Sequence, residues 1–429
     1  MAEIEPLYAL HYDLATAGAL GDLVAPPYDV IDAALRAQLA ARSPNNVVNV
    51  DLPAVQDDAD PYAAAGARFE QWQRDGVIVR DAQPAIWAHE QDYVGPDGVA
   101  RTRRGFFCRV RIEEYGPGRV RPHERTHPGP KEDRLRLTRA TRCNLSPIFS
   151  LYSDPDAAAW SALGPHIAAE PFGTARDGEG TEHRLWRVDD QGAIEAVIAA
   201  TAGAELLIAD GHHRYETAQA YSREIGQTDT SPVTPPHGYV LMCLVALEDP
   251  GLTVFPTHRL AGGLDAERSE ALCRAIERDF EGREVSEDEL VQLTAAPPGG
   301  AFEMGFVDRA HERPRWLTLK DQSVADAALD GHSDSYKHLD TGVLEGLILK
   351  GTLGLGDDDI SHLNGFGYAR HPADAIRCVR DGAFDAAFLM RPTPVAQIRD
   401  IAAAGENMPP KSTFFYPKLL TGLLFNPLY

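Results

Sequence analysis

Apolar and polar residues follow two different periods along this chain. Stretches of alternating or continuous apolar residues predict strands, whereas apolar residues that recur every three or four positions predict helices. We expect strands at residues 46–52, 85–94, 104–112, 147–152, 206–209, 239–247, 252–260 and 384–390. We expect helices at residues 32–41, 61–76, 213–224, 265–279, 341–350, 372–380 and 395–404. The mixture predicts an α+β fold of mixed sheets with flanking helices, in which strands 239–247 and 252–260 are neighbours.

The chain is long enough for more than one hydrophobic core. It has 429 residues, and single cores rarely grow beyond about 250–300 residues. The best place to divide it lies between residues 152 and 183. We therefore expect an N-terminal α+β region at 1–160 and a second α+β region at 161–429, although the two can pack as one unit.

Net charge limits the binding partners that the protein can have, and cysteine content indicates its cellular compartment. The formal net charge is −23, which argues against a nucleic-acid-binding surface because such surfaces need clustered Lys and Arg. It leaves room for a basic pocket that binds one nucleotide. The five cysteines are scattered without a C-x-x-C pair, which is typical of free thiols in a reducing compartment. With no leader-like segment and no apolar run near 18 residues, we expect a cytoplasmic protein that is not in a membrane.

The most informative stretch is "LLIADGHHRYETA", from Leu206 to Ala218. An apolar strand is followed by a turn at Asp210 and Gly211, and then by a helix that begins with two histidines and Arg214. The first N–H groups of a helix lack intrahelical partners and carry partial positive charge, so they attract anions. The turn is therefore a candidate phosphate site, in which Asp210 holds Mg²⁺ or orients a histidine. The plain alternative is a helix cap with surface histidines.

The segment "HERTH", from His123 to His127, matches the H-E-x-x-H pattern of zinc proteases. That pattern needs both histidines on one continuous helix. Pro122 precedes the segment and Pro128 follows it, and proline disfavours helix in the residue before it. We therefore predict that "HERTH" is not a zinc-binding helix and that His127 lies in extended or turn geometry. Its polar groups, with the nearby Lys131, Asp133 and Arg134, are still candidates for a base and for phosphate contacts.

Near the C-terminus, "GENMPPKS" (Gly405 to Ser412) differs by one residue from the phosphate-loop pattern G-x-x-x-x-G-K-S. Pro410 replaces the glycine and removes a backbone N–H that such a loop needs. A helix precedes the segment where a strand is required. It is not a phosphate loop, but Lys411 and Ser412 are candidate ligand contacts, with a structured turn as the alternative.

Five segments together resemble a known family. "PPYDVI", "PHERT", "IADGHHRYETA", "PTHR" and "MPPKSTFFYPKLLTGL" occur in this order in a bacterial family called domain-of-unknown-function family 1015. A strand that ends in a D-G-x-H-R turn also resembles, more remotely, the nucleotide-binding motif of the ParB/sulfiredoxin superfamily, which includes free-serine kinases. That resemblance implies a ParB/sulfiredoxin-like core with N- and C-terminal elaborations.

The remote resemblance also implies roles for individual residues. It assigns phosphate binding to Gly211, His213 and Arg214, with Asp210 and His212 beside them. A kinase of this kind uses a carboxylate as base, for which Glu124 and Asp29 are the candidates.

These observations lead us to expect an ATP-dependent (or ADP-dependent) kinase that phosphorylates the hydroxyl of a small amino acid, with L-serine as the leading substrate. Phosphoryl transfer depends mainly on positioning and charge neutralisation. Mg²⁺ at Asp210 would bridge the nucleotide phosphates, and Arg214 with His213 would stabilise the transferred group. Two alternatives stay open: a metal-dependent hydrolase that uses His123, His127 and the turn from Asp210 to His213, and a nucleotide-sensing module without turnover. The substrate and the assembly also stay open, and a homodimer is one option.

Overall fold

The computed structural model describes residues 3–54, 60–115, 119–124, 128–226, 234–311 and 313–429. The chain forms two compact units. Unit 1 comprises Met1–Pro122, Thr126–Leu252 and Pro417–Tyr429, and unit 2 comprises His123–Arg125 and Thr253–Tyr416. The expected boundary between residues 160 and 161 falls inside unit 1, because β8 and β10, which lie on its two sides, belong to one sheet.

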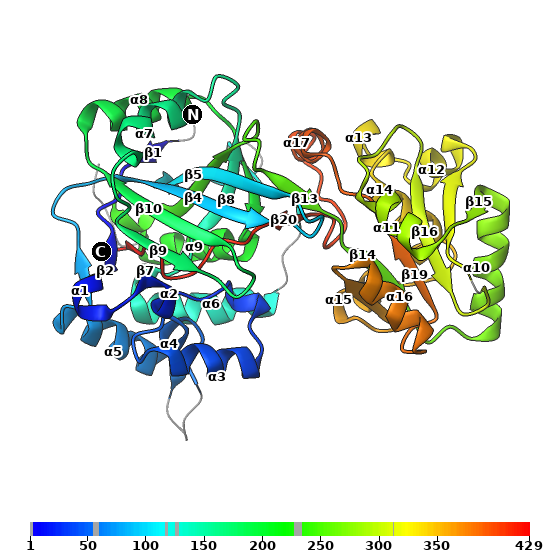
Figure 1. The fold of residues 1–429 in the computed structure, drawn as a ribbon, viewed down its shortest axis with the longest axis horizontal. Coiled ribbons are helices and arrows are strands. Elements are labelled where there is room, and N and C mark those ends of the chain that lie inside the picture. Colours follow the sequence, from blue (N-terminus) through cyan, green and yellow to red (C-terminus); the bar gives the residue numbers. More distant parts are fainter. Residues whose placement is uncertain (1–2, 55–59, 116–118, 125–127, 227–233, 312) are drawn as a thin grey trace. The chain divides into compact units, whose positions relative to one another are not determined.

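A nine-stranded mixed sheet forms the centre of the described part of unit 1 (Figure 1). Its strands, in spatial order, are β6 (Val120–Arg121), β11 (Leu206–Asp210), β8 (Ile148–Tyr152), β12 (Tyr239–Ala246), β5 (Ala100–Arg111), β4 (Ile86–Val94), β10 (Glu182–Val188) and β9 (Gly173–Arg176), with β1 (Ile4–Glu5) paired to β5. Two pairs, β11 with β6 and β12 with β8, are parallel, and the other pairs are antiparallel. Two small ribbons accompany it: β2 (Leu10–Tyr12) with β3 (Ile78–Arg80), and β7 (Cys143–Asn144) with β21 (Asn426–Pro427).

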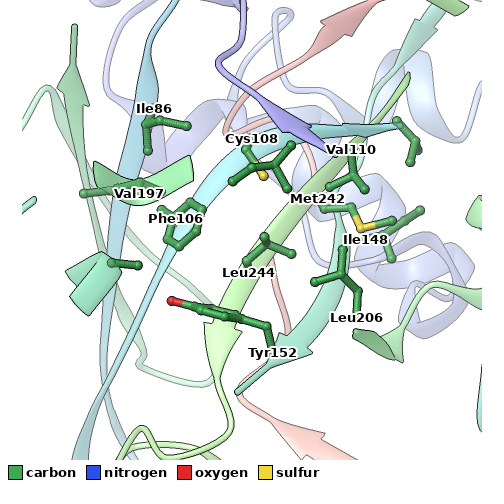
Figure 2. Close-up of a cluster of buried hydrophobic side chains, with 14 of the residues drawn as sticks. Ile86, Phe106, Cys108, Val110, Ile148, Tyr152, Val197, Leu206, Met242 and Leu244 are labelled. Atoms are coloured by element: carbon green, nitrogen blue, oxygen red, sulfur yellow. The ribbon is translucent and has the colours of Figure 1, made fainter. Parts of the chain in front are cut away.

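The helices of unit 1 are interspersed with these strands along the chain. They are α1 (Leu14–Ala17), α2 (Leu20–Leu23), a 3₁₀ turn (Tyr28–Val30), α3 (Ala33–Arg42), α4 (Val48–Asp51), α5 (Pro61–Arg74), α6 (Pro128–Thr141), α7 (Ala158–Ile167), α8 (Gln191–Thr201), α9 (His212–Gly226) and a second 3₁₀ turn (Pro236–Gly238). Alternate residues of β4, β5 and β12 build a buried core, as expected of strands whose side chains alternate between two faces. Figure 2 shows Ile86, Phe106 and Met242 from these strands together with Val197 of α8 in that cluster.

Unit 2 contains a six-stranded sheet whose pairs are all antiparallel. Its strands, in spatial order, are β15 (Phe280–Glu284), β17 (Arg315–Leu319), β16 (Glu303–Asp308), β19 (Ala386–Leu389), β14 (His258–Ala261) and β18 (Phe366–Ala369). A separate ribbon pairs β13 (Thr253–Phe255) with β20 (Phe414–Tyr416). Its helices are α10 (Ala266–Asp279), α11 (Glu287–Ala295), α12 (Gln322–Ala328), α13 (Asp334–Lys337), α14 (Asp340–Leu344), a π-helix (Glu345–Lys350), α15 (Asp357–His362), α16 (Pro372–Arg380) and α17 (Val395–Ala403). Helices accompany one mixed sheet and one antiparallel sheet, which confirms the predicted α+β class.

Two element predictions are wrong. Residues 46–52 form no strand: Val48–Asp51 is helix α4, because the Asn46 side chain accepts a hydrogen bond from the Val48 N–H at 2.9 Å and starts a turn. Strands β12 and β13 are not neighbours either. The chain leaves the nine-stranded sheet after β12, and β13 pairs with β20 whereas β14 pairs with β18 and β19.

Candidate functional site

The predicted strand-turn-helix motif is present. Strand β11 ends at Asp210, Gly211 turns the chain, and α9 begins at His212. Gly211 has φ +101°, a left-handed backbone conformation that residues other than glycine rarely adopt. A Cβ atom at this position would also lie 3.0 Å from Nε of Arg214. Glycine therefore permits both the turn and the close approach of the Arg214 guanidinium.

Two cations hold the carboxylate at the end of β11. Arg214 Nη2 donates to Asp210 Oδ2 at 2.6 Å, and Lys418 Nζ donates to Asp210 Oδ1 at 2.8 Å. Burial by itself would raise the pKa of Asp210, but the charges of Lys418 and Arg214 outweigh it and hold that pKa well below its ordinary value. Arg214 Nη1 also donates to Ser146 Oγ at 2.7 Å and to the carbonyl of Pro147. One carboxylate with two cations leaves the turn with an excess of positive charge, which suits an anion.

The arrangement does not fit Mg²⁺ held by Asp210, since both carboxylate oxygens already accept hydrogen bonds from cations. Among the residues that the structure describes, no group of three or more His, Cys, Asp and Glu side chains could hold a metal ion. The Asp210 carboxylate orients Arg214 instead. His212 is buried and His213 is partly exposed at the start of α9.

A small cavity of about 40 Å³ lies beside Arg214. Polar side chains from five separate segments line it, among them Tyr28, Asp51, Arg134, Asn144, Ser146, Arg214 and Thr217. Tyr28 belongs to "PPYDVI", so the structure brings that motif to the same cavity as the D-G-H-H-R turn. Asp29, one of the two carboxylates named as candidate bases, is next to Tyr28 in the 3₁₀ turn and is exposed.

Asp51 and Arg134 form a buried ion pair in the wall of this cavity. Arg134 Nη1 donates to Asp51 Oδ1 at 2.9 Å, and the guanidinium lies 4.4 Å from the centre of the Tyr28 ring. Arg134 also donates to Asp133 Oδ2 at 2.6 Å. Burial raises the pKa of Asp51, and the charges of Arg134 and Arg214 only partly oppose it. Sequence reasoning singled out Arg134 but missed Asp51 and Tyr28.

His123 and Glu124 lie in unit 2 and are not helical. His123 is 1% exposed, its Nε2 is 2.9 Å from Thr413 Oγ1, and Glu124 forms a parallel β-bridge with Met408. Helix α6, which the apolar pattern did not predict, begins at Pro128. A zinc-protease helix from His123 is therefore absent, although His127 itself lies outside the described residues.

The segment "GENMPPKS" follows α17 and leads into β20, so it has neither the strand nor the helix of a phosphate loop. Lys411 is exposed with φ +59°, and its backbone N–H donates to Glu124 Oε1 at 3.3 Å. Ser412 is buried; its hydroxyl donates to the Pro409 carbonyl at 2.6 Å and lies 2.7 Å from Thr341 Oγ1. Ligand contacts by these two residues remain a prediction.

The candidate residues thus fall into two groups. Asp29, Asp210, Gly211, His212, His213 and Arg214 belong to unit 1, whereas Glu124, Lys411 and Ser412 belong to unit 2. Within unit 1 the structure adds Lys418, Ser146, Tyr28, Asp51 and Arg134 to the first group. In unit 2 it joins "PHERT" to "MPPKST" through the Glu124–Met408 bridge.

One family model covers most of the chain, including the D-G-H-H-R turn. The model of the family described as "Protein of unknown function (DUF1015)" matches residues 4–341. The chain is a DUF1015 protein. A comparison with curated proteins finds no significant relative.

Several solved structures are distantly similar to this DUF1015 chain. A free serine kinase in complex with AMP matches with 14% identity and a TM-score of 0.33, over 69% of this chain and 83% of that one. A truncated SbnI from Staphylococcus aureus matches with 11% identity and a TM-score of 0.34, over 71% and 82%. A conserved hypothetical protein from Pyrococcus furiosus matches with 14% identity and a TM-score of 0.33, over 70% and 89%. The scores are too low to carry an argument, so the proposals below rest on the residues of this chain.

A helix that spans a membrane has to be both long and hydrophobic. Among the described residues, no helix combines the length and the apolar character needed to cross a bilayer.

Proposed function

We propose that this protein is an ATP-dependent small-molecule kinase that phosphorylates the hydroxyl of an amino acid, with free L-serine as the leading substrate. The observation that carries the proposal is the cation-rich turn at the end of β11. There Arg214 and Lys418 surround one carboxylate, and the first N–H groups of the fifteen-residue helix α9 follow at once. Cations and a helix N-terminus together favour phosphate. ADP is the alternative phosphoryl donor.

In this proposal the turn holds the nucleotide phosphates. The backbone N–H groups after Gly211 and the Arg214 guanidinium neutralise their charge, and His212 and His213 lie at the same helix end. Phosphoryl transfer needs this kind of positioning and electrostatic stabilisation more than covalent help. Mg²⁺ would be held by the nucleotide phosphates, because Asp210 is engaged by its two cations. A nucleotide-sensing module remains the alternative and predicts binding without turnover.

The first test is the Arg214→Ala variant. Loss of a charge-assisted hydrogen bond should weaken ATP or ADP binding by about 1.5–3 kcal/mol in calorimetry. Arg223→Ala is a matched control on the same helix, since Arg223 is 58% exposed and pairs with Glu114. It should leave affinity unchanged. Equal affinity of Arg214→Ala and wild type would remove the turn from the nucleotide site.

Turnover separates the proposed kinase from a binding module. Purified protein should be incubated with ATP and Mg²⁺, or with ADP, against a panel of hydroxyl-bearing amino acids that begins with L-serine. A phosphorylated product is expected. Nucleotide binding with no acceptor consumed would favour the sensing module.

A further inference from the structure

Asp51 is a buried carboxylate with an oxygen that nothing in the described structure satisfies. The residue is 3% exposed. Its Oδ1 accepts from Arg134, whereas its Oδ2 has no hydrogen-bond partner among the described residues. Buried polar atoms are nearly always hydrogen-bonded, and leaving one without a partner is costly. Because Asp51 lines the cavity beside Arg214, a ligand in that cavity can supply the missing donor.

The fold holds Asp51 firmly in this position. It is the last residue of α4, where Val48 and Val50 are completely buried. The Asn46 side chain accepts from the Val48 N–H and donates to the carbonyls of Asp22 and Val24 at 2.8 and 3.0 Å. The start of the helix is thus fastened to the preceding segment. A carboxylate held this way keeps its direction without help from a ligand.

Charge in the cavity favours a neutral hydroxyl as that donor. Arg134 and Arg214 both line the same space, so a ligand ammonium group would meet two positive charges as well as one carboxylate. A hydroxyl group has no net charge to repel. With about 40 Å³, the cavity holds a group of a few heavy atoms such as a hydroxymethyl end, and not a nucleotide.

We propose that Asp51 is the catalytic carboxylate that accepts the proton of the acceptor hydroxyl when the phosphoryl group is transferred. This assignment rests on the proposed kinase function. The acceptor oxygen forms a bond to the γ-phosphorus of ATP while the bond from that phosphorus to the bridging oxygen of ADP breaks. The hydroxyl proton passes to Asp51 Oδ2 and then to solvent. Arg214, in the same cavity wall, neutralises the transferred group.

The surroundings of Asp51 suit a base. Burial raises its pKa above the ordinary 3.8, against the opposing charges of Arg134 and Arg214, and Asp133 raises it further. The other titratable groups in the cavity wall are Tyr28 and Cys143, and burial raises the pKa of each. Activity should therefore fall on the acid side as Asp51 gains a proton, at a pH above that of an ordinary aspartate.

The test compares Asp51→Asn with Asp133→Asn. Both replacements remove a carboxylate from Arg134, but only Asp51 lines the cavity and the Asp133 side chain is 42% exposed. With ATP, Mg²⁺ and L-serine or the best acceptor from the panel, Asp51→Asn should lower kcat about 10²–10⁴-fold and leave calorimetric ADP affinity nearly unchanged. Asp133→Asn tests the other carboxylate beside Arg134 and should not show this loss of kcat. Because the charge of Asp133 helps to raise the pKa of Asp51, this variant should move the acid limb of the pH–rate profile to lower pH. Asp29→Asn and Glu124→Gln are assayed beside them as the other candidate bases.

The outcomes separate this assignment from the kinase proposal. If the wild type is active and Asp51→Asn keeps a nearly normal kcat, the assignment of Asp51 is overturned and the kinase proposal stands. The same holds if the large loss of kcat occurs in Asp29→Asn or Glu124→Gln instead. A wild type that phosphorylates no hydroxyl overturns both. If Asp51→Asn does not fold, the wild-type pH–rate profile decides: an acid limb above the range of an ordinary aspartate supports Asp51, and a flat profile through that range contradicts it.

Discussion

Asp210 and Asp51 lie near the same arginine, yet their surroundings move their pKa values in opposite directions. Burial by itself raises the pKa of both carboxyl groups. Asp210 also accepts hydrogen bonds from Lys418 and Arg214, and their charges lower its pKa. Asp51 has one direct cation, and burial dominates. Carboxylates whose environments separate their pKa values are suited to different tasks. Here Asp210 is suited to orienting a cation and Asp51 to receiving a proton.

The sequence could predict only those parts of the site that are close along the chain. Gly211 and the apolar run before it indicated a strand-to-helix turn that could bind an anion. The ion pair of Asp210 with Arg214 was not predicted, because Asp210 was expected to hold Mg²⁺ or to orient a histidine. Lys418 lies 208 residues from its partner Asp210, and no local pattern signals such a contact. Asp51 was missed because its segment was interpreted as a strand, which hid the helix end that carries it.

His258, from the "PTHR" segment, provides a residue-scale test of burial in unit 2. It is completely buried on β14, its Nδ1 accepts from the Met390 N–H at 3.1 Å, and its Nε2 has no partner among the described residues. Burial, aided by the charge of Arg259, lowers its pKa from 6.5 to about 3. Between these values the unfolded chain binds a proton that the folded chain does not, so stability is lost as pH falls below 6.5.

We expect His258→Gln, whose amide can still accept from Met390, to reduce this acid sensitivity. The free energy of unfolding of wild type should fall with decreasing pH more steeply than that of the variant, by up to about 1.4 kcal/mol per pH unit. Urea denaturation at several pH values between 6.5 and 4, followed by a probe in unit 2, measures both slopes. Parallel slopes would show that His258 is not buried as a neutral side chain.

At the scale of elements, long helices were predictable and the links between elements were not. Apolar periodicity located α5, α10 and α16 within two residues at each end, because each has one face to bury. Apolar periodicity could not show that the chain leaves the nine-stranded sheet after β12 and enters the six-stranded sheet at β14. Both strands are buried, so their apolar patterns look alike. The partner of a strand depends on residues far away in sequence.

The packing of helix α5 against helix α6 is such a long-range contact. It helps to hold the candidate site in place, because α6 carries Arg134. A Cβ atom on Gly66 of α5 would lie 2.6 Å from the Ala140 carbonyl oxygen of α6. Gly66→Ala should therefore push the helices apart and lower the free energy of unfolding by about 1–3 kcal/mol. Gly164→Ala on α7 is the control, because nothing lies within 4 Å of its added Cβ. Chemical denaturation measures both, and equal stabilities would contradict the close packing.

At the scale of the whole molecule, the order of the chain conceals the division into units. Each unit contains segments from distant parts of the sequence: the C-terminal Pro417–Tyr429 belongs to unit 1, and His123–Arg125 belongs to unit 2. His123 and Glu124 pair with the segment around Met408, which explains why they separate from their sequence neighbours. A single boundary drawn along the sequence could not describe this arrangement.

Net charge is a whole-molecule property with a direct consequence for binding. At −23, the protein should repel polyanions over its surface, whereas the local cations Arg214 and Lys418 can still attract one nucleotide. Nucleic-acid affinity comes largely from the neutralisation of many phosphates by Lys and Arg, and a single turn cannot supply it. Fluorescence anisotropy should therefore show binding of a labelled ADP and no binding of a labelled 20-nucleotide DNA at about 0.15 M salt, near physiological ionic strength. Lowering the salt should not produce specific DNA binding, because weaker screening strengthens the repulsion. DNA binding that tightens steeply as salt falls would reveal a basic surface and contradict this prediction.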